Sequence, residues 1–317
     1  METTLRLIGG VIGLVLLYYG AEFLVRGGVQ IAKRFHVSSL VIGLTLVAFA
    51  TSAPELVVSC DAALRGAGDI ALGNVIGSNV CNIALILGLC AVITPLTVNP
   101  KLFRVDVPLM IGASILLTVF YLLSGGINRL EGALFLIGIF VYTVGSILHA
   151  KRCGESASAE ETEEEKKKDL AIGWAVALVV IGLAALVGGA KLLVEAAICL
   201  AKLAGVSQAV IGLTIVAVGT SLPELATSVV AAVKGERDIA IGNVVGSNIF
   251  NILAILGAAP LLQPLQGNRI SPVDLGVMLF CAVILYPMMR TGNTISRKEG
   301  AFLLFIYIAY TTWLIVA

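Results

Sequence analysis

Two glutamates stand in the middle of apolar segments, where a carboxylate can bind a cation or release a proton. The first segment reads GLTLVAFATSAPEL over 43–56, and the second reads GLTIVAVGTSLPEL over 212–225. In a helix, Thr51 and Ser52 precede Glu55 by one turn, so the three oxygen-bearing side chains share one face. The second segment repeats this arrangement with Thr220, Ser221 and Glu224. Carboxylates flanked by hydroxyls form an all-oxygen set, which suits hard cations.

A proline directly before each glutamate adds backbone oxygens to this set. Pro54 and Pro223 lack an amide donor and clash with the preceding turn, so each helix is expected to kink there. The kink frees carbonyls around 48–50 and 217–219. In a membrane a freed carbonyl needs a partner, and a bound cation can serve as one.

The energetics of two buried carboxylates favour bound cations. An ionised carboxylate at the bilayer centre costs at least about 2.5–3.5 kcal/mol, and two that face each other also repel. The pair stays ionised only with counter-cations, either one divalent ion or two or three monovalent ions. The alternative is a structural role for each protonated glutamate. The matched prolines and the symmetric pair favour the cation site.

A second motif also occurs twice, as GDIALGNVIGSNVCNIALILG over 68–88 and RDIAIGNVVGSNIFNILAILG over 237–257. Each copy contains GxxxG, which lets helix backbones approach closely. Each copy also places polar residues at i, i+4 and i+8 on one face, namely Asn74, Ser78 and Asn82, and Asn243, Ser247 and Asn251. Such a stripe either fastens helices together or offers neutral oxygens to an ion, and its repetition beside the Pro-Glu segments favours coordination.

The composition places these motifs in a polytopic membrane protein. The 317 residues are 58% hydrophobic and 13% charged, against about 45–50% and about 25% in soluble domains. These values exclude a soluble enzyme and a disordered protein, and the net charge of +1 excludes a nucleic-acid binder with a basic face. Two histidines and six cysteines without CxxC spacing argue against a zinc site.

The fold class predicted from the apolar segments is all-α, with ten transmembrane helices of about 20 residues each. The predicted spans are 5–25, 37–63, 70–94, 102–124, 130–149, 171–200, 207–232, 239–263, 272–290 and 299–317. A polar linker over 150–170 follows the fifth span. Fifteen Lys and Arg residues fall on the linker side and six on the side of the termini. The positive-inside rule therefore predicts a plasma (inner) membrane protein with a cytoplasmic linker and both termini outside.

An internal repeat organises these spans. Residues 41–88 align with 210–257 at a constant offset of 169, and 30 of the 48 aligned pairs are identical. The chain is thus predicted to contain two five-helix repeats, 1–149 and 171–317. Because five is odd, the second repeat enters the membrane inverted. Inverted repeats are typical of secondary transporters, whose site lies at the midplane between the repeats.

The paired GxTxxAxxTSxPEL and GNxxGSNxxN motifs resemble the cation/calcium exchanger superfamily, and most closely its prokaryotic sodium/calcium exchangers. The resemblance implies an antiporter, not an enzyme, that needs no cofactor and exchanges Ca²⁺ for Na⁺, normally three Na⁺ per Ca²⁺, by alternating access. It also implies that the first and sixth helices slide over a core of eight. By position, the implied ion ligands are Glu55, Glu224, Thr51, Ser52, Ser78, Asn82, Thr220, Ser221, Ser247 and Asn251, with the carbonyls of Ala48 and Ala217 at flanking sodium sites.

Asn251 stands where several relatives of this superfamily, including potassium-dependent exchangers, carry Asp. The core then has two carboxylates rather than three, which argues against potassium dependence and removes one protonatable group. Ca²⁺/H⁺ exchange remains an alternative, because a glutamate pair can also release protons. A passive cation channel is disfavoured by the inverted repeat. An intramembrane metal-dependent hydrolase is disfavoured because the midplane lacks His and a nucleophile–base pair.

Charged pairs are also expected near the ends of the long helices. Glu22 and Arg26 stand four residues apart, and Lys191 and Glu195 repeat the spacing with the signs exchanged. We expect both to form i,i+4 ion pairs near the membrane interface. Asp61 and Arg65 have the same spacing and the same expectation.

Overall fold

The computed structural model describes residues 2–35, 37–152, 171–204, 217–267 and 269–316. Most of the predicted linker and the start of the predicted span over 207–232 lie outside these ranges. The two parts of the chain that the sequence repeat defines, 1–149 and 171–317, are called the first and second half below.

The described residues are almost entirely helical, and several helices contain a π-helical stretch, marked η. The first half contains α1 (Glu2–Phe35), α2 (Ser39–Ile42), η1 (Gly43–Val47), α3 (Ala48–Thr51), α4 (Ala53–Leu64), α5 (Gly68–Val80), η2 (Cys81–Leu87), α6 (Gly88–Ile93), β1 (Leu96–Thr97), η3 (Leu102–Asp106), α7 (Val107–Ser124), β2 (Gly126–Ile127) and α8 (Arg129–Arg152). The second half contains α10 (Ile172–Leu203), α12 (Ala217–Thr220), α13 (Leu222–Val233), α14 (Arg237–Phe250), η5 (Asn251–Ile255), α15 (Leu256–Leu262), β3 (Leu265–Gln266), α16 (Pro272–Arg290), β4 (Thr294–Ile295) and α17 (Arg297–Val316).

Eight continuous helices in the described part of the chain are long and apolar enough to cross a membrane. The pair Ser39–Thr51 and Ala53–Leu64, bent by 46°, passes the same test as one broken span. These elements match nine of the ten predicted spans, although α1 extends well beyond the predicted 5–25. For the span predicted over 207–232, the structure describes only α12 and the 12-residue α13. The count of ten therefore stays a prediction.

The bend predicted at Pro54 is confirmed, and its geometry decides where Glu55 lies. Ser52 leaves the helical conformation (φ −83°, ψ 5°), and a new helix, α4, starts at Ala53 with Pro54 in its first turn. Proline is favoured at this place because the amide it lacks has no acceptor there. Ser221 has nearly the same conformation (φ −87°, ψ 6°) just before α13.

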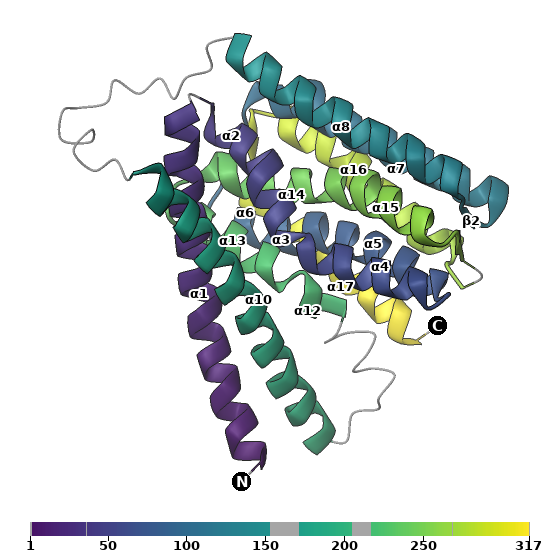
Figure 1. Cartoon of the computed structure of the whole chain (residues 1–317), viewed down its shortest axis with the longest axis horizontal. Helices are drawn as coiled ribbons and strands as arrows, with labels where there is room; N and C mark the ends of the chain where they lie inside the picture. Colours follow the sequence, from purple (N-terminus) through teal and green to yellow (C-terminus); the bar gives the residue numbers. More distant parts are fainter. Residues whose placement is uncertain (1, 36, 153–170, 205–216, 268, 317) are drawn as a thin grey trace.

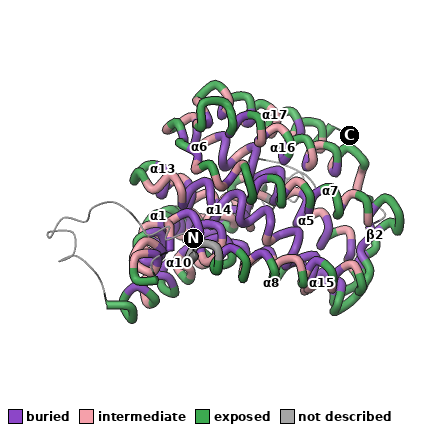
Figure 2. Tube along the Cα trace, turned by 90° about the horizontal axis from the view of Figure 1, so that it is seen from above, coloured by how far each residue is buried: buried purple, intermediate pink, exposed green. Residues whose placement is uncertain are grey.

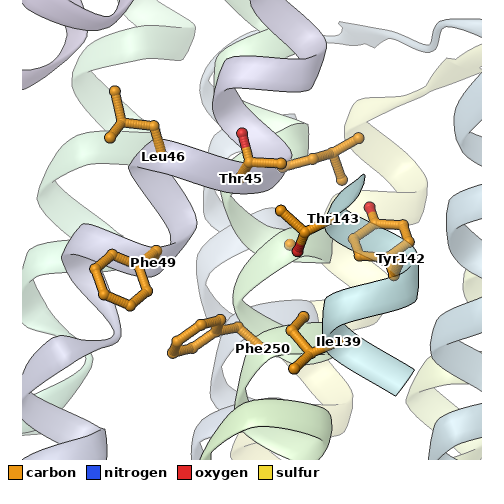
Figure 3. Close-up of a pocket in the computed structure, with 9 residues that line it drawn as sticks. Thr45, Leu46, Phe49, Ile139, Tyr142, Thr143 and Phe250 are labelled. Carbon is orange, nitrogen blue, oxygen red and sulfur yellow. The ribbon is translucent and has the colours of Figure 1, made fainter. Parts of the chain in front are cut away.

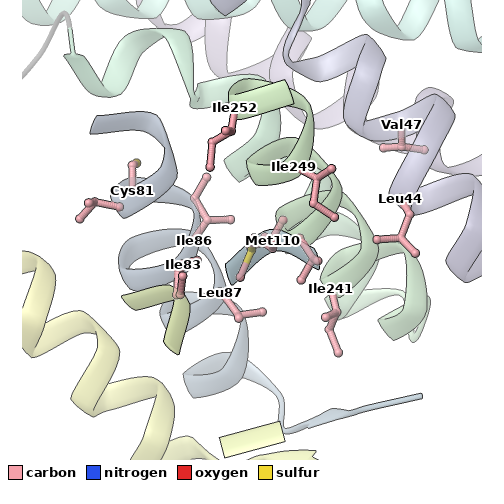
Figure 4. Close-up of a cluster of buried hydrophobic side chains, with 14 of the residues drawn as sticks. Leu44, Val47, Cys81, Ile83, Ile86, Leu87, Met110, Ile241, Ile249 and Ile252 are labelled. Carbon is pink, nitrogen blue, oxygen red and sulfur yellow. The ribbon is translucent and has the colours of Figure 1, made fainter. Parts of the chain in front are cut away.

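The buried centre of the molecule is built on the two copies of the second motif. In an apolar stretch of 18 residues within α14–η5–α15, 94% of the residues are buried. The corresponding stretches of α5–η2–α6 and α17 are 72% and 17% buried. Figure 2 shows the same contrast between this centre and the outer helices. Apolar side chains such as Ile86, Ile249 and Ile252 fill the space between the two copies (Figure 4).

Helices α1 and α10 form a separate pair at one edge of the molecule (Figure 1). Their backbones touch where glycines face each other. A Cβ on Gly20 would lie 2.9 Å from the carbonyl oxygen of Gly182, and one on Gly182 would lie 2.7 Å from that of Gly20. Only residues without a side chain permit this approach.

Two short antiparallel ladders join loops of the first half to loops of the second. Strand β1 pairs with β4, with Leu96 opposite Ile295. Strand β2 pairs with β3, with Ile127 opposite Leu265. The ladders hold the two halves together at both ends of the helices.

Candidate cation site

The two glutamates lie in matching places, in the first turns of α4 and α13. The helices restart at Ala53 and Leu222, so Glu55 and Glu224 come directly after the two breaks. Both side chains are only 1% exposed. The N-terminus of a helix carries partial positive charge, which favours a carboxylate in the first turn. The break therefore places each carboxylate in the interior at the end of the helix that best tolerates it.

Serine–glutamate hydrogen bonds cross between the two halves. Ser52 Oγ donates to Glu224 Oε1 at 2.9 Å. Ser221 Oγ donates to Glu55 Oε1 at 3.3 Å. The sequence predicted each serine next to the glutamate of its own half, whereas the structure bonds it to the other glutamate. This crossing brings both carboxylates to one place, as the prediction of a shared site requires.

The two threonines of the motif join the same site. Thr220 interacts with the Glu55 carboxyl, and Thr51 interacts with the Glu224 carboxyl. Thr51 also donates to Asn243 Oδ1 at 3.0 Å. Both predicted threonine ligands therefore lie against the carboxylate of the opposite half.

Backbone carbonyls near the breaks are less free than expected. The Ala48 carbonyl accepts the Ser52 amide at 3.0 Å, so the kink does not release it. The same carbonyl also accepts the Thr51 hydroxyl, at 3.4 Å, so an ion would have to take the place of this weaker bond. Pro54 offers no amide to the carbonyl of Ala50, which stands four residues earlier. Ala217 is the first described residue of α12, and its side chain lies outside the described part of the structure.

The asparagines that open the two stripes fasten helices together. Asn74 Nδ2 donates to Ser59 Oγ at 2.9 Å and to the Glu55 carbonyl at 3.3 Å. In the second half, Asn243 Nδ2 makes the same bonds to Ser228 Oγ and the Glu224 carbonyl, at 2.9 Å and 3.4 Å. These bonds hold each glutamate-bearing helix against the helix of the second motif.

The asparagines that end the stripes bond to residues of the opposite half. Asn82 Nδ2 donates to Asn248 Oδ1 at 3.2 Å, and Asn251 Nδ2 donates to Asn79 Oδ1 at 3.1 Å. The sequence analysis did not select Asn79 or Asn248, because they stand one position off the polar stripe. Their presence in both copies of GNxxGSN was the signal that could have identified them.

Six buried oxygens at this centre have no hydrogen-bond partner. They form three pairs related by the repeat, namely Glu55 Oε2 and Glu224 Oε2, Ser78 Oγ and Ser247 Oγ, and Asn82 Oδ1 and Asn251 Oδ1. Buried polar atoms in proteins are normally paired, because an unpaired one costs free energy. Carboxylate, hydroxyl and carboxamide oxygens are the ligands of hard cations. Among the described residues no three His, Cys, Asp or Glu side chains cluster, so neutral oxygens must complete any cation shell here.

An apolar cavity of about 310 Å³ lies near this centre but is distinct from it. It lies between η1, α3, α8 and α14, where the rings of Phe49 and Phe250 meet edge to face at 5.1 Å (Figure 3). None of the predicted ligands lines this cavity. The candidate site is therefore the group of buried oxygens described above and not this apolar cavity.

Known proteins resemble this chain in sequence and in fold over nearly its whole length. The sequence model of the family described as "Sodium/calcium exchanger protein" matches residues 5–148 and 174–316. The putative antiporter CaxA of Alkalimonas amylolytica is 40% identical, with 94% of this chain and 95% of CaxA covered. The inner membrane protein YrbG of Escherichia coli is 35% identical, with 96% of each chain covered.

A solved structure of the sodium-calcium exchanger NCX_Mj, soaked with Na⁺ and Sr²⁺, superposes with a TM-score of 0.82. It is 34% identical in sequence, and the superposition covers 97% of this chain and 98% of NCX_Mj. The apolar helices make the present chain an integral membrane protein. The family model, the full-length relatives and the shared structure together place it: the chain belongs to the sodium/calcium exchanger family.

Proposed function

We propose that this protein is a secondary-active antiporter that exchanges Ca²⁺ for Na⁺ across the inner membrane by alternating access. The observation that carries the proposal is the group of six unpaired oxygens, three from each half, around two carboxylates that the crossed serines bring together. One Ca²⁺ neutralises both carboxylates, and Na⁺ ions can replace it at the same oxygens.

The proposed ligands are the residues that the sequence predicted. Glu55 and Glu224 share the Ca²⁺ ion, and hydroxyl and carboxamide oxygens complete the sites. These oxygens belong to Thr51, Ser52, Ser78, Asn82, Thr220, Ser221, Ser247 and Asn251. The carbonyls of Ala48 and Ala217 line the flanking Na⁺ sites. With Asn at 251 the centre carries two negative charges. Exchange of three Na⁺ for one Ca²⁺ moves one net positive charge in the direction of the Na⁺ ions.

The proposed topology is ten helices in two inverted halves, 1–149 and 171–317, with both termini outside and the 150–170 linker in the cytoplasm. The two ladders support it. The topology places β1 and β4 on the cytoplasmic side and β2 and β3 on the outer side, and each strand pairs with one on its own side. The Asp69 carboxylate, which accepts the Arg269 amide at 2.8 Å, also joins two loops assigned to the outer side.

The proposed moving part is the α1–α10 pair, which slides over the remaining helices to open the site to either side. Its two helices pack on each other through facing glycines and stand at one edge of the molecule. Cross-linking α1 to the core should therefore stop exchange and leave ion binding intact, and continued exchange would refute the sliding.

The experiment that tests the function is ⁴⁵Ca²⁺ uptake into vesicles that contain the purified protein. Vesicles loaded with Na⁺ should take up Ca²⁺ only when external Na⁺ is absent, and uptake should respond to an imposed membrane potential. Uptake that follows a pH step and ignores Na⁺ would show Ca²⁺/H⁺ exchange instead. Flux that needs no counter-ion would show a channel.

A further inference from the structure

Each proposed asparagine ligand is held by an asparagine of the opposite half. Asn82 donates its amide to Asn248, and Asn251 donates its amide to Asn79, at 3.2 Å and 3.1 Å. All four side chains are at most 2% exposed. The four residues lie on α5–η2 and α14–η5, which pack directly on each other.

These bonds decide which end of each ligand carboxamide remains available. A carboxamide has an oxygen that accepts and an NH₂ that donates, and half a turn of the group exchanges them. With their NH₂ groups bound, Asn82 and Asn251 both keep an Oδ1 atom without a partner. With Asn248 and Asn79 oriented as in the structure, a turn of either ligand group would bring its oxygen against the oxygen of its partner, and its NH₂ would replace the ligand oxygen.

We propose that Asn79 and Asn248 are positioning residues, which fix the ligand carboxamides so that oxygen and not NH₂ faces the cation. The inference rests on the proposed function, since it takes Asn82 and Asn251 as ligands. Each half then sets the orientation of a ligand that belongs to the other half, and neither half completes its own set alone.

The remaining contacts of the two residues favour this role over simple helix fastening. Asn79 Nδ2 is buried without a partner, and Asn248 Nδ2 reaches only the sulfur of Met110, at 3.6 Å. Thioether sulfur is a weak acceptor. A residue present only to fasten helices would use both ends of its carboxamide, as Asn243 does. Its Nδ2 donates to Ser228 Oγ and to the Glu224 carbonyl, and its Oδ1 accepts from Thr51. Here only the oxygen end is well used, and that is the end that holds a ligand.

The test is the Ca²⁺ affinity of purified protein, measured by calorimetry in Na⁺-free buffer. Asn79→Leu keeps the size of the side chain and removes the acceptor, so Asn251 is free to turn, and Ca²⁺ binding should weaken about tenfold. The decisive measurement is the same substitution in two other backgrounds. In Asn251→Asp the ligand has two equivalent oxygens, so Asn79→Leu should change the affinity less than about twofold. In Asn82→Asp the Asn251 carboxamide is still present, so the loss of about tenfold should persist.

An equal loss in both backgrounds would show that Asn79 acts through packing and would overturn the inference, as would no loss in the native background. Asn248→Leu gives an independent test, which also serves if Asn79→Leu does not fold. Here the loss of affinity should disappear in Asn82→Asp and persist in Asn251→Asp. Glu55→Gln in the same assay separates the two hypotheses. If it leaves Ca²⁺ binding unchanged, the proposed site is wrong. If it abolishes binding and the asparagine variants do not behave as stated, only the positioning role fails.

Discussion

At the centre of the molecule, equivalent residues of the two halves make equivalent hydrogen bonds. The contact of α1 with the core has no such equivalent in the other half. At the centre, Ser52 binds Glu224 just as Ser221 binds Glu55. At the edge, Glu22 of α1 forms an ion pair of 2.5 Å with Lys234, at the end of α13. The residues 169 positions away are Lys191 and Arg65, two like charges that cannot form this pair.

A second electrostatic interaction at the same edge also lacks an equivalent in the other half. Burial raises the pKa of the Glu236 carboxyl, and the negative charge of Asp238 raises it further. The positive charge of Lys33 on α1 lowers this pKa. The equivalent positions carry Lys202 and Ala67, so the attraction has no counterpart in the other half. Arg65 bonds instead within its own helix, to Asp61 at 2.8 Å.

The difference fits the proposed function. If a cation is bound between the halves, oxygens of both halves must face it, which favours equivalent contacts at the centre. The charged residues of α1 and α10 have no proposed ion to face, and their charges can favour one position of the pair over the other. Substitutions in matched positions should therefore have equal effects at the centre and unequal effects at the edge.

The largest effect is expected at the two carboxylates. Glu55→Gln and Glu224→Gln each remove half of the charge that holds Ca²⁺ and should each lower Ca²⁺ exchange by about a hundredfold or more. Vesicle uptake at equal protein content measures the loss. Asp61→Asn is the matched control, because it makes the same change on α4 at an exposed side chain, and it should leave uptake within about twofold. A large difference between the two glutamate variants would break the symmetry of the centre.

A smaller and equal effect is expected at the crossed serines. Ser52→Ala and Ser221→Ala each remove a hydrogen bond to a buried carboxylate, which is worth about 1.5–3 kcal/mol. The Ca²⁺ concentration for half-maximal uptake should rise about tenfold in each variant. Ser114→Ala is the control, because this buried hydroxyl bonds only to the Met110 carbonyl of its own helix. A shift in only one of the two serine variants would show that the centre, like the edge, is not symmetric.

Most of the fold and many of the residues that meet at the candidate site were predictable from the sequence. Apolar length located the spans, and the prolines located the breaks at Ser52 and Ser221. The crossing of serines to the opposite glutamates was not predictable, because helix periodicity describes one face and not the partner across it. Glu22 shows the same limit: the i,i+4 pairing with Arg26 was wrong, since the ion pair of Glu22 is with Lys234, more than two hundred residues away in sequence.

Asn79 and Asn248 were missed for a more local reason. The polar stripe was traced at a spacing of four residues, which selects one line of side chains along the helix. Asn79 and Asn248 come one residue after the stripe serines, about 100° around the helix, yet they bond to Asn251 and Asn82 of the opposite half. The face that reaches the other half is therefore wider than one stripe.

The smallest predicted effect lies at the edge. The side chains of Lys234 and Glu22 are 37% and 26% exposed, and a partly exposed ion pair contributes about 0.2–1 kcal/mol. Lys234→Ala should therefore shift the ratio of apparent Ca²⁺ affinities at the two membrane faces by about twofold to fivefold, with little change in maximal exchange. Lys191→Glu would give the equivalent positions 191 and 65 opposite charges, so that an ion pair could form there in the other position of the α1–α10 pair, and it should shift the ratio the other way. Vesicles of defined orientation measure both ratios.

Glu22→Lys combined with Lys234→Glu restores the pair with reversed signs and should return the ratio to its native value. If it does not, the attraction between these two charges is not what distinguishes the edge from the centre.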